Sequence, residues 1–96
     1  MQVPDSKHVI DRPDHNRFEL ALDDEIAIAA YRREGNTLIL THTEVPEALE
    51  GQGIASALVA GLLDQVRARH EKVVPLCAFV RAYLERHPEQ ADLVAG

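Results

Sequence analysis

The best candidates in this sequence for accepting a proton or attacking a carbonyl group are His42, Glu44 and Cys77. Histidine has an ordinary pKa close to physiological pH, so it can serve as a base there. In a strand, His42 and Glu44 would share one face because they are two residues apart. We expect Leu38 and Leu40 on that same face. The pair is therefore a candidate catalytic base, although an inert strand histidine beside a solvated carboxylate fits the same pattern.

Cys77 follows a short apolar run and precedes a helical pattern, so we expect it at the carboxyl end of a strand. Ligands collect at that edge of α/β sheets, and the N-terminus of a following helix favours the thiolate. Cys77 is therefore a candidate covalent acyl carrier. The alternatives are that it lines an acyl pocket, or that it is a buried cysteine packed as a small apolar side chain.

A glycine-containing turn precedes the longest helical pattern of the chain: Glu50-Gly51-Gln52-Gly53-Ile54-Ala55. Its glycines allow a tight turn and let a ligand approach without a Cβ in the way. The first N–H groups of a helix have no intrahelical partner, and the helix dipole adds positive potential there. The residues that define a P-loop or a dinucleotide fingerprint are missing. The turn predicts a phosphate or pyrophosphate site, or else a glycine-rich start of a helix with no ligand.

Alternating apolar residues predict the strands that would position these groups. Residues 17–22 and 25–33 alternate, and residues 37–45 are rich in β-branched side chains. The short connections between them favour an antiparallel three-stranded meander. Residues 1–16 hold too few apolar side chains for a core element, so we expect a flexible leader with room for one short strand, followed by a folded domain.

The change to helical spacing after residue 53 predicts an amphipathic helix that runs to about Glu71. The apolar run 73–77 then predicts a strand parallel to the third one, joined to it by a right-handed crossover. A second helix over residues 78–86 and a last helical turn over 89–94 complete the predicted α/β fold. The apolar residues that define the first helix recur every four positions: Ile54, Leu58, Leu62 and Val66.

Residues 43–55 resemble the acetyl-CoA signature of the GNAT superfamily of N-acetyltransferases. That signature is a strand ending in Val-Pro or Val-x-Pro, then Arg/Gln-x-x-Gly-x-Gly/Ala, then an amphipathic helix. Gly53 and Ala55 match its last two defined positions, whereas Glu50 stands where the signature has Arg or Gln. Residues 31–36 and 75–80 extend the similarity to a short stand-alone GNAT-like family of the acetyltransferase-CG type.

The resemblance implies a reduced GNAT fold of the α/β (α+β) class, without the first strand and the two helices that usually cover the acceptor side. It implies an acetyl-CoA-dependent N-acetyltransferase acting on an amine, and the missing helices favour an amine of a protein or peptide. The pantetheine arm would lie between the third strand and the strand over residues 73–77. The residues that would hold acetyl-CoA or coenzyme A are Val45, Glu50, Gly51, Gln52, Gly53, Ile54 and Ala55.

The net charge of −6 argues against nucleic acid as a partner, because binding it requires a basic surface. No apolar run approaches the roughly 18 residues of a membrane span, and the N-terminus lacks a signal-peptide pattern. We therefore expect a cytoplasmic protein, as a monomer or as a homodimer in which a second copy supplies the missing wall. One cysteine and five scattered histidines predict no metal site.

Two other functions fit the sequence. A CoA-binding or acyl-CoA-binding module without catalysis is favoured by Glu50, because a carboxylate beside a pyrophosphate is repulsive. Such a module would serve as a sensor or as an interaction partner of another protein. The third reading is a scaffold that binds no cofactor.

Overall fold

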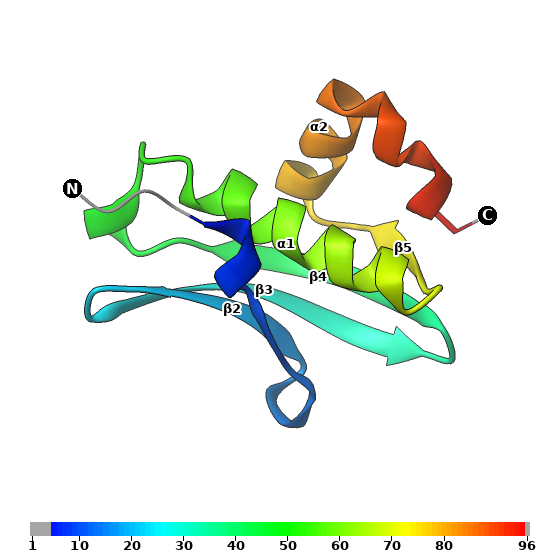
Figure 1. Cartoon of the computed structure of the whole chain (residues 1–96), viewed down its shortest axis with the longest axis horizontal. Coiled ribbons are helices and arrows are strands. Elements are labelled where there is room, and N and C mark those ends of the chain that lie inside the picture. The colour runs from blue at the N-terminus through cyan, green and yellow to red at the C-terminus, as the bar shows by residue number, and fades with distance from the viewer. Residues whose placement is uncertain (1–4, 96) are drawn as a thin grey trace.

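The computed structural model describes residues 5–95 as a mixed sheet with α1 and α2 packed against one face (Figure 1). The strands lie in the order β1-β2-β3-β4-β5, antiparallel up to β4 and parallel between β4 and β5. This architecture confirms the predicted α/β class. In chain order the elements are the 3₁₀ helix η1 (Ser6–His8), β1 (Ile10–Arg12), η2 (Pro13–His15), β2 (Arg17–Leu22), β3 (Glu25–Glu34), β4 (Thr37–Glu44), η3 (Glu47–Leu49), α1 (Ile54–Ala68), β5 (Lys72–Pro75), α2 (Ala78–Arg86) and η4 (Pro88–Leu93).

Strands β2, β3 and β4 form the predicted antiparallel meander. Phe18 and Leu20 of β2 and Ala29 of β3 are buried under the helices, because alternate side chains of a strand share one face. Gly35 takes a φ of 63° in the turn between β3 and β4, a backbone conformation that suits a tight hairpin. The side chains on the other face, such as Ile26, remain exposed.

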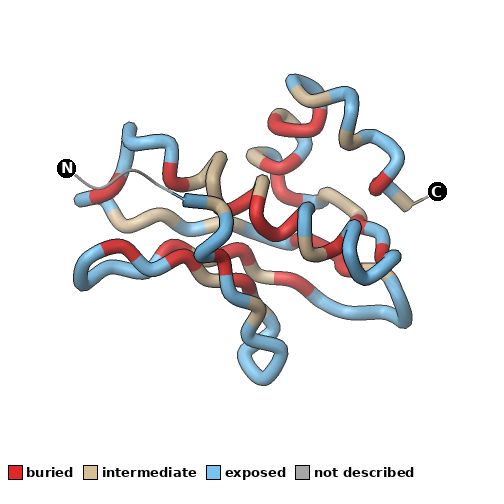
Figure 2. Tube along the Cα trace, in the orientation of Figure 1, coloured by how far each residue is buried: buried red, intermediate tan, exposed pale blue. Residues whose placement is uncertain are grey.

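Helix α1 crosses the sheet and connects β4 to the parallel strand β5. Figure 2 shows buried segments on α1 and on the strands beneath it. The helix ends at Ala68, before the predicted limit near Glu71. The reason is that His70 is left-handed, with a φ of 58°, and the Glu71 N–H donates to the Val66 carbonyl at 3.0 Å. The predicted four-residue repeat is buried throughout: Ile54, Leu58, Leu62 and Val66.

Residues 5–16 pack against the domain instead of forming the flexible leader that we expected. Val9 is buried against Gly61 of α1, where any Cβ would collide with Val9 and with the backbone of η1. The Gln65 side-chain amide donates to the Val9 carbonyl at 2.7 Å, and β1 pairs with β2. One buried valine is enough to anchor this segment to α1, because Gly61 has no side chain and lets Val9 approach the helix backbone closely. Residues 1–4 of the expected leader lie outside the described residues.

A group of paired polar side chains lies near the carboxyl end of α1. Arg69 donates to the Asp11 carboxylate at 2.8 Å, and that carboxylate also accepts the Tyr31 hydroxyl at 2.6 Å. Arg33 and Glu71 form a neighbouring pair at 2.5 Å. The Asp11 and Glu71 side chains are only 9% and 10% exposed. We call these five residues the charge cluster; it links β1 and β3 to the segment between α1 and β5.

The C-terminal segment lies beside β5. The Ala95 N–H donates to the Val73 carbonyl at 2.9 Å, and Val73 forms an isolated parallel bridge with Val94. Arg67 of α1 holds Asp92 of η4 through two hydrogen bonds of 2.8 and 3.0 Å. The last helical turn predicted from the sequence is therefore η4, which is fastened to both α1 and β5.

Candidate functional site

The turn before α1 leaves the N-terminus of that helix accessible. Gly51 and Gly53 take φ values of 79° and 73°, which glycine adopts without strain, and a Cβ at either position would meet open space. The first helical hydrogen bond runs from the Ala57 N–H to the Gly53 carbonyl at 3.0 Å, so the earlier N–H groups project from the helix end. The sequence of the first turn contains no acidic residue. These N–H groups and the helix dipole together attract an anion.

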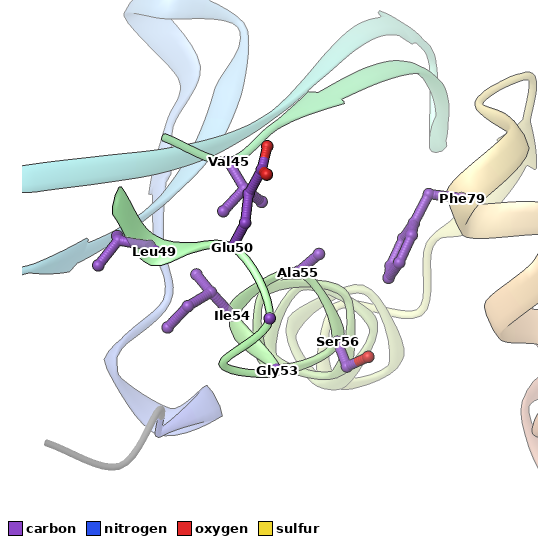
Figure 3. A pocket seen from close by; sticks show the side chains of 9 residues that line it. Val45, Leu49, Glu50, Gly53, Ile54, Ala55, Ser56 and Phe79 are labelled. Atoms are coloured by element: carbon purple, nitrogen blue, oxygen red, sulfur yellow. The ribbon is translucent and has the colours of Figure 1, made fainter. Parts of the chain in front are cut away.

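A pocket of about 230 Å³ opens at this end of α1 (Figure 3). Glu50 and Val45 lie on one side of it and Phe79 of α2 lies on the other. The pocket can therefore accept an elongated molecule with an anion at the turn and an apolar arm between Val45 and Phe79. Its lining consists of Val45, Leu49, Glu50, Gly51, Gly53, Ile54, Ala55, Ser56 and Phe79.

Six of the seven residues that the sequence analysis assigned to a cofactor line this pocket. The exception is Gln52, whose side-chain amide turns back and donates to the Ala48 carbonyl at 3.3 Å. The sequence analysis missed Leu49, Ser56 and Phe79. Phe79 is half-buried beside the core, next to the fully buried stripe of α2. A helical wheel with Val80, Tyr83 and Leu84 at its centre would have shown Phe79 at the margin of the stripe.

Glu50 is the charged residue among the lining residues that the structure describes. Glu50 is exposed to solvent, and its carboxylate lies on the Val45 side of the pocket (Figure 3). Two unit charges about 4 Å apart in water interact by about 1 kcal/mol, and salt weakens this further. Glu50 therefore opposes an anion at the turn only modestly, and the backbone N–H groups remain available.

Strands β4 and β5 part after Leu40. They pair from Thr37 to Leu40, and then Leu76 and Cys77 both donate their N–H groups to the Leu40 carbonyl at 3.0 Å. The chain turns into α2 at this point, whereas β4 continues to Glu44. Cys77 therefore lies where the two parallel strands separate.

The Cys77 sulfur is buried and contacts polar groups. Its Sγ lies 3.6 Å from the Thr43 hydroxyl oxygen. Burial raises the pKa of the Cys77 thiol, but the N–H groups of Val80 and Phe79 and the polar groups of Thr43 outweigh burial, so the pKa is lowered from its ordinary value. A lower pKa increases the share of thiolate, which is the nucleophilic form.

His42 and Glu44 lie on the face of the sheet opposite to the one we expected. Strand β4 contains a bulge, because Thr41 is an extra residue between the partners of Ala30 and Tyr31. Side chains alternate between the two faces of a strand, and an extra residue shifts this alternation by one. Residues after the bulge therefore face the side opposite to the one that regular alternation predicts. The expectation of strict alternation along β4 was therefore wrong.

The bulge divides the predicted catalytic residues between two faces. Leu38 and Leu40, which we had placed beside the histidine, are buried in the core under the helices. His42 and Glu44 contact each other, with 3.1 Å between Nε2 and Oε2, and their side chains are 54% and 63% exposed. Cys77 lies on the helix side. The three residues therefore do not form one cluster.

Residues 5–95 contain no group of three or more histidine, cysteine, aspartate or glutamate side chains arranged to hold a metal ion. Within the same range, none of the helices combines the length and the apolar character needed to cross a membrane.

Residues 17–93 match the model of a family described as GCN5-related N-acetyl-transferase. The chain is also 35% identical over 63 residues to Protein NATD1 of chicken (Gallus gallus) and of mouse (Mus musculus). That match covers 65% of this chain and 57% of each relative, so the chain spans less than two thirds of their length.

The fold is similar to that of a GCN5-like protein from Staphylococcus aureus solved by NMR in solution. The TM-score is 0.70, and the match covers 95% of this chain and 90% of the other. At 24% sequence identity this likeness concerns the fold alone.

Proposed function

Because the chain belongs to the family of GCN5-related N-acetyltransferases, we propose that it transfers an acetyl group from acetyl-CoA to a primary amine. The pocket at the accessible N-terminus of α1 is the observation that carries this proposal. It places an anion-attracting turn next to an apolar wall, and coenzyme A has a pyrophosphate next to a pantetheine arm. A cytoplasmic location, where acetyl-CoA and reduced thiols are available, belongs to the same proposal.

The backbone of residues 51–55 would hold the pyrophosphate, and β4 would hold the pantetheine arm. The arm would pass Val45 toward the place where β4 and β5 part, beside Cys77. The open backbone of the turn fits this ligand, since a Cβ at either glycine meets no neighbour. The Glu50 carboxylate opposes its charge, as described above.

Acetyl-CoA supplies an activated acyl group: the amine nitrogen bonds to the carbonyl carbon, the carbon–sulfur bond breaks, and its electron pair leaves on sulfur. The ammonium must first lose a proton, because an amine with a pKa of about 10.4 is less than about 0.1% neutral at pH 7. His42, paired with Glu44 at 3.1 Å, would accept that proton on the open face of the sheet. A second proton leaves nitrogen as the amide forms, and the sulfur leaving group takes up one proton.

A second route uses Cys77 as a covalent carrier, and the lowered pKa of its thiol favours that route. The acetyl group would move from the CoA sulfur to the Cys77 Sγ and then to the amine nitrogen, which restores the thiolate. We propose direct transfer, with Cys77 lining the acyl pocket. Cys77→Ser then keeps most activity, whereas His42→Ala or Glu44→Ala loses it.

Mass spectrometry of the protein mixed with acetyl-CoA alone separates the two routes. Direct transfer leaves the protein mass unchanged. The covalent route adds one acetyl group, which is absent in Cys77→Ser and is discharged by an amine. An acetylated Cys77 that forms and decays at the turnover rate would contradict direct transfer.

An NMR titration with CoA tests the cofactor site. Amide shifts should centre on residues 51–55 and on Val45. Ala55→Asp and Ala68→Asp are matched variants that add a carboxylate at opposite ends of α1. Ala55→Asp should weaken CoA binding about fivefold by charge repulsion while keeping the thermal stability, because an acid suits a helix N-terminus. Ala68→Asp should leave CoA affinity unchanged. Shifts centred elsewhere, or none at millimolar CoA, would contradict the proposal.

Glu50 favours one further candidate function, a CoA-binding module without catalysis, because its carboxylate weakens cofactor binding without blocking it. Incubation with labelled acetyl-CoA and a set of amines distinguishes the two. Label on an amine supports the transferase, whereas CoA binding without label on any amine or on Cys77 supports the module.

A further inference from the structure

Strand β3 turns its larger apolar side chains away from the core, onto the open face of the sheet opposite α1 and α2 (Figure 1). Ala27 and Ala29 are buried under the helices, whereas Ile26 is 47% exposed and Ile28 is only half-buried. A sheet with one solvated face usually carries its apolar residues inward and its polar residues outward. The reverse order along β3 indicates that another molecule covers the open face.

The open face carries two rows of side chains that run across strands β1 to β4. One row contains carboxylates, and we call it the acidic row; the basic row contains cationic side chains. The rows lie two residues apart along each strand, a distance of about 6.7 Å. In strand order, the acidic row is Ile10, Glu19, Ile28 and Glu44, and the basic row is Arg12, Arg17, Ala30 and His42.

A second copy of the chain is complementary to both rows at once. A two-fold axis that crosses the strands between the rows would lay each strand antiparallel on its own copy, as in face-to-face sheet packing. The acidic row would then lie over the basic row, with Glu19 over the partner's Arg17 and Glu44 over the partner's His42. An axis along the strands through the middle of the rows would instead bring Arg12 against the partner's His42.

We propose that the open face is a self-association surface and that its occupant is a second copy of this chain. His42 and Glu44 lie within the rows and are exposed in the single chain, so the second copy covers them. The consequence for activity rests on the proposed function, in which His42 accepts the proton of the amine. The paired form excludes the amine, and the single chain is the active form.

The association is weak and reversible, because the charges of the rows already have partners within one chain. Arg17 donates to Glu19 at 2.8 Å, and His42 lies 3.1 Å from Glu44. A second copy shares these charges instead of pairing free ones, and each exposed pair contributes little. We expect a Kd on the order of 10 µM at low salt, which rises about tenfold as salt screens the rows.

Sedimentation velocity tests the association without catalysis. The protein should change from monomer to dimer between micromolar and millimolar concentrations, and added salt should reverse the change. In NMR spectra recorded during dilution, amide shifts should centre on Ile26, Ile28 and the two rows. A monomer at every concentration, or shifts centred on residues 51–55, would overturn the proposal.

Ile10→Lys and Ile10→Glu test the arrangement of the two copies. Residue 10 is 48% exposed and would lie over the partner's Arg12, so the lysine variant should raise the Kd at least about tenfold and the glutamate variant should not. Within one chain the preference is reversed, because Glu19 is the cross-strand partner of Ile10. Val94→Lys, 37% exposed and outside both rows, should associate like the parent protein. Equal association of the two Ile10 variants would overturn the arrangement.

Turnover at increasing protein concentration tests the consequence for activity. The rate per chain should fall about twofold when the protein concentration equals the Kd, and it should stay constant over the same range in Ile10→Lys. A constant rate in an associating parent protein would overturn the regulation. If no amine is acetylated at all, the proposed function fails, while sedimentation still decides whether the open faces associate.

Discussion

The two ends of helix α1 are built in opposite ways. At its N-terminus, the turn with Gly51 and Gly53 presents backbone N–H groups beside a pocket whose lining is mainly apolar. At its carboxyl end, the charge cluster and the Arg67–Asp92 pair join the helix to β1, β3 and η4. Backbone N–H groups at one end face the pocket, whereas charged side chains at the other end form pairs within the chain.

Because the two ends differ in this way, the stability of the fold and the affinity for CoA should depend on different ends of α1. Changes at the carboxyl end should lower the free energy of unfolding and leave CoA affinity intact, because the pairs there contact no part of the pocket. Changes at the N-terminus should alter the CoA affinity and leave the free energy of unfolding intact. A fixed carboxyl end also keeps the N–H groups at the other end in a constant direction, which electrostatic binding requires.

The largest expected effect breaks the charge cluster. Asp11→Ala should lower the free energy of unfolding by about 2–4 kcal/mol, because the Tyr31 hydroxyl and the Arg69 guanidinium lose a buried partner. Urea denaturation measures this. Asp14→Ala removes a carboxylate whose side chain is 74% exposed and should cost less than about 0.5 kcal/mol. A folded Asp11→Ala protein with reduced CoA affinity would contradict the separation of the two ends.

The charge cluster should also make stability depend on alkaline pH. Burial and the neighbouring Asp11 carboxylate raise the pKa of Tyr31 to about 12, above the ordinary value of about 10. The folded protein therefore keeps a proton that the unfolded chain loses, so this stabilisation is full below about pH 10 and is lost as the pH rises toward about 12.

Denaturation at successive pH values should show this decline, with a slope of up to about 1.4 kcal/mol per pH unit. Tyr31→Phe should be less stable than the parent protein near neutral pH and should lack that part of the decline. Tyr83→Phe keeps the Tyr31 hydroxyl, so it should still show the part of the alkaline decline that comes from Tyr31. Equal slopes in the parent protein and in Tyr31→Phe would show that Tyr31 does not hold its proton in this way.

At the other end of α1, Glu50→Arg should sharpen the comparison by strengthening the attraction for anions. Replacing one repulsive charge by an attractive one at an exposed site should tighten CoA binding by about 1–2 kcal/mol. Isothermal titration calorimetry at several salt concentrations should show the gain shrinking as salt increases, with Glu50→Gln intermediate. Unchanged affinity in the arginine variant would mean that Glu50 does not face the pyrophosphate.

The smallest expected effect concerns the left-handed residue that follows α1. His70 has a φ of 58°, a left-handed conformation that glycine adopts more readily. His70→Gly should therefore raise the free energy of unfolding by about 0.5–1 kcal/mol. Thermal unfolding measures this gain. His70→Ala does not relieve the left-handed conformation, so its free energy of unfolding should not rise. CoA affinity should be the same in both variants.

Much of the fold could be predicted because the periodicity of the sequence is consistent along β2, β3, β4 and α1. Local patterns could not predict the packing of residues 5–16, which depends on contact between Val9 and Gly61, residues that are far apart in the chain. The predicted end of α1 was also wrong, because it lay too late in the chain. Nothing in the sequence marks His70 as left-handed, since glycine is the usual residue there.

The candidate site was predictable where backbone forms it and less so where side chains do. Two glycines before a helix indicate an accessible helix N-terminus whatever surrounds them. The face of His42 was mispredicted because the run Leu38-Ile39-Leu40 contains no polar residue and so gives no sign of a bulge at the next position. The position of Phe79 depends on which side of α2 is buried, and this is set by α1 and the sheet.

The bulge at Thr41 has a consequence for telling related chains apart. It directly follows Leu40, the last residue of β4 that pairs with β5, and a bulge bends its strand away from the previous course. A chain lacking this one residue would keep His42 and Glu44 on the open face, but its straighter β4 could remain beside β5 and exclude a pantetheine arm. If the pantetheine arm lies there as proposed, such a chain would retain every candidate side chain and still lose its affinity for acetyl-CoA. The number of residues in β4 would then be a better criterion than catalytic side chains for sorting active members from chains that share only the architecture.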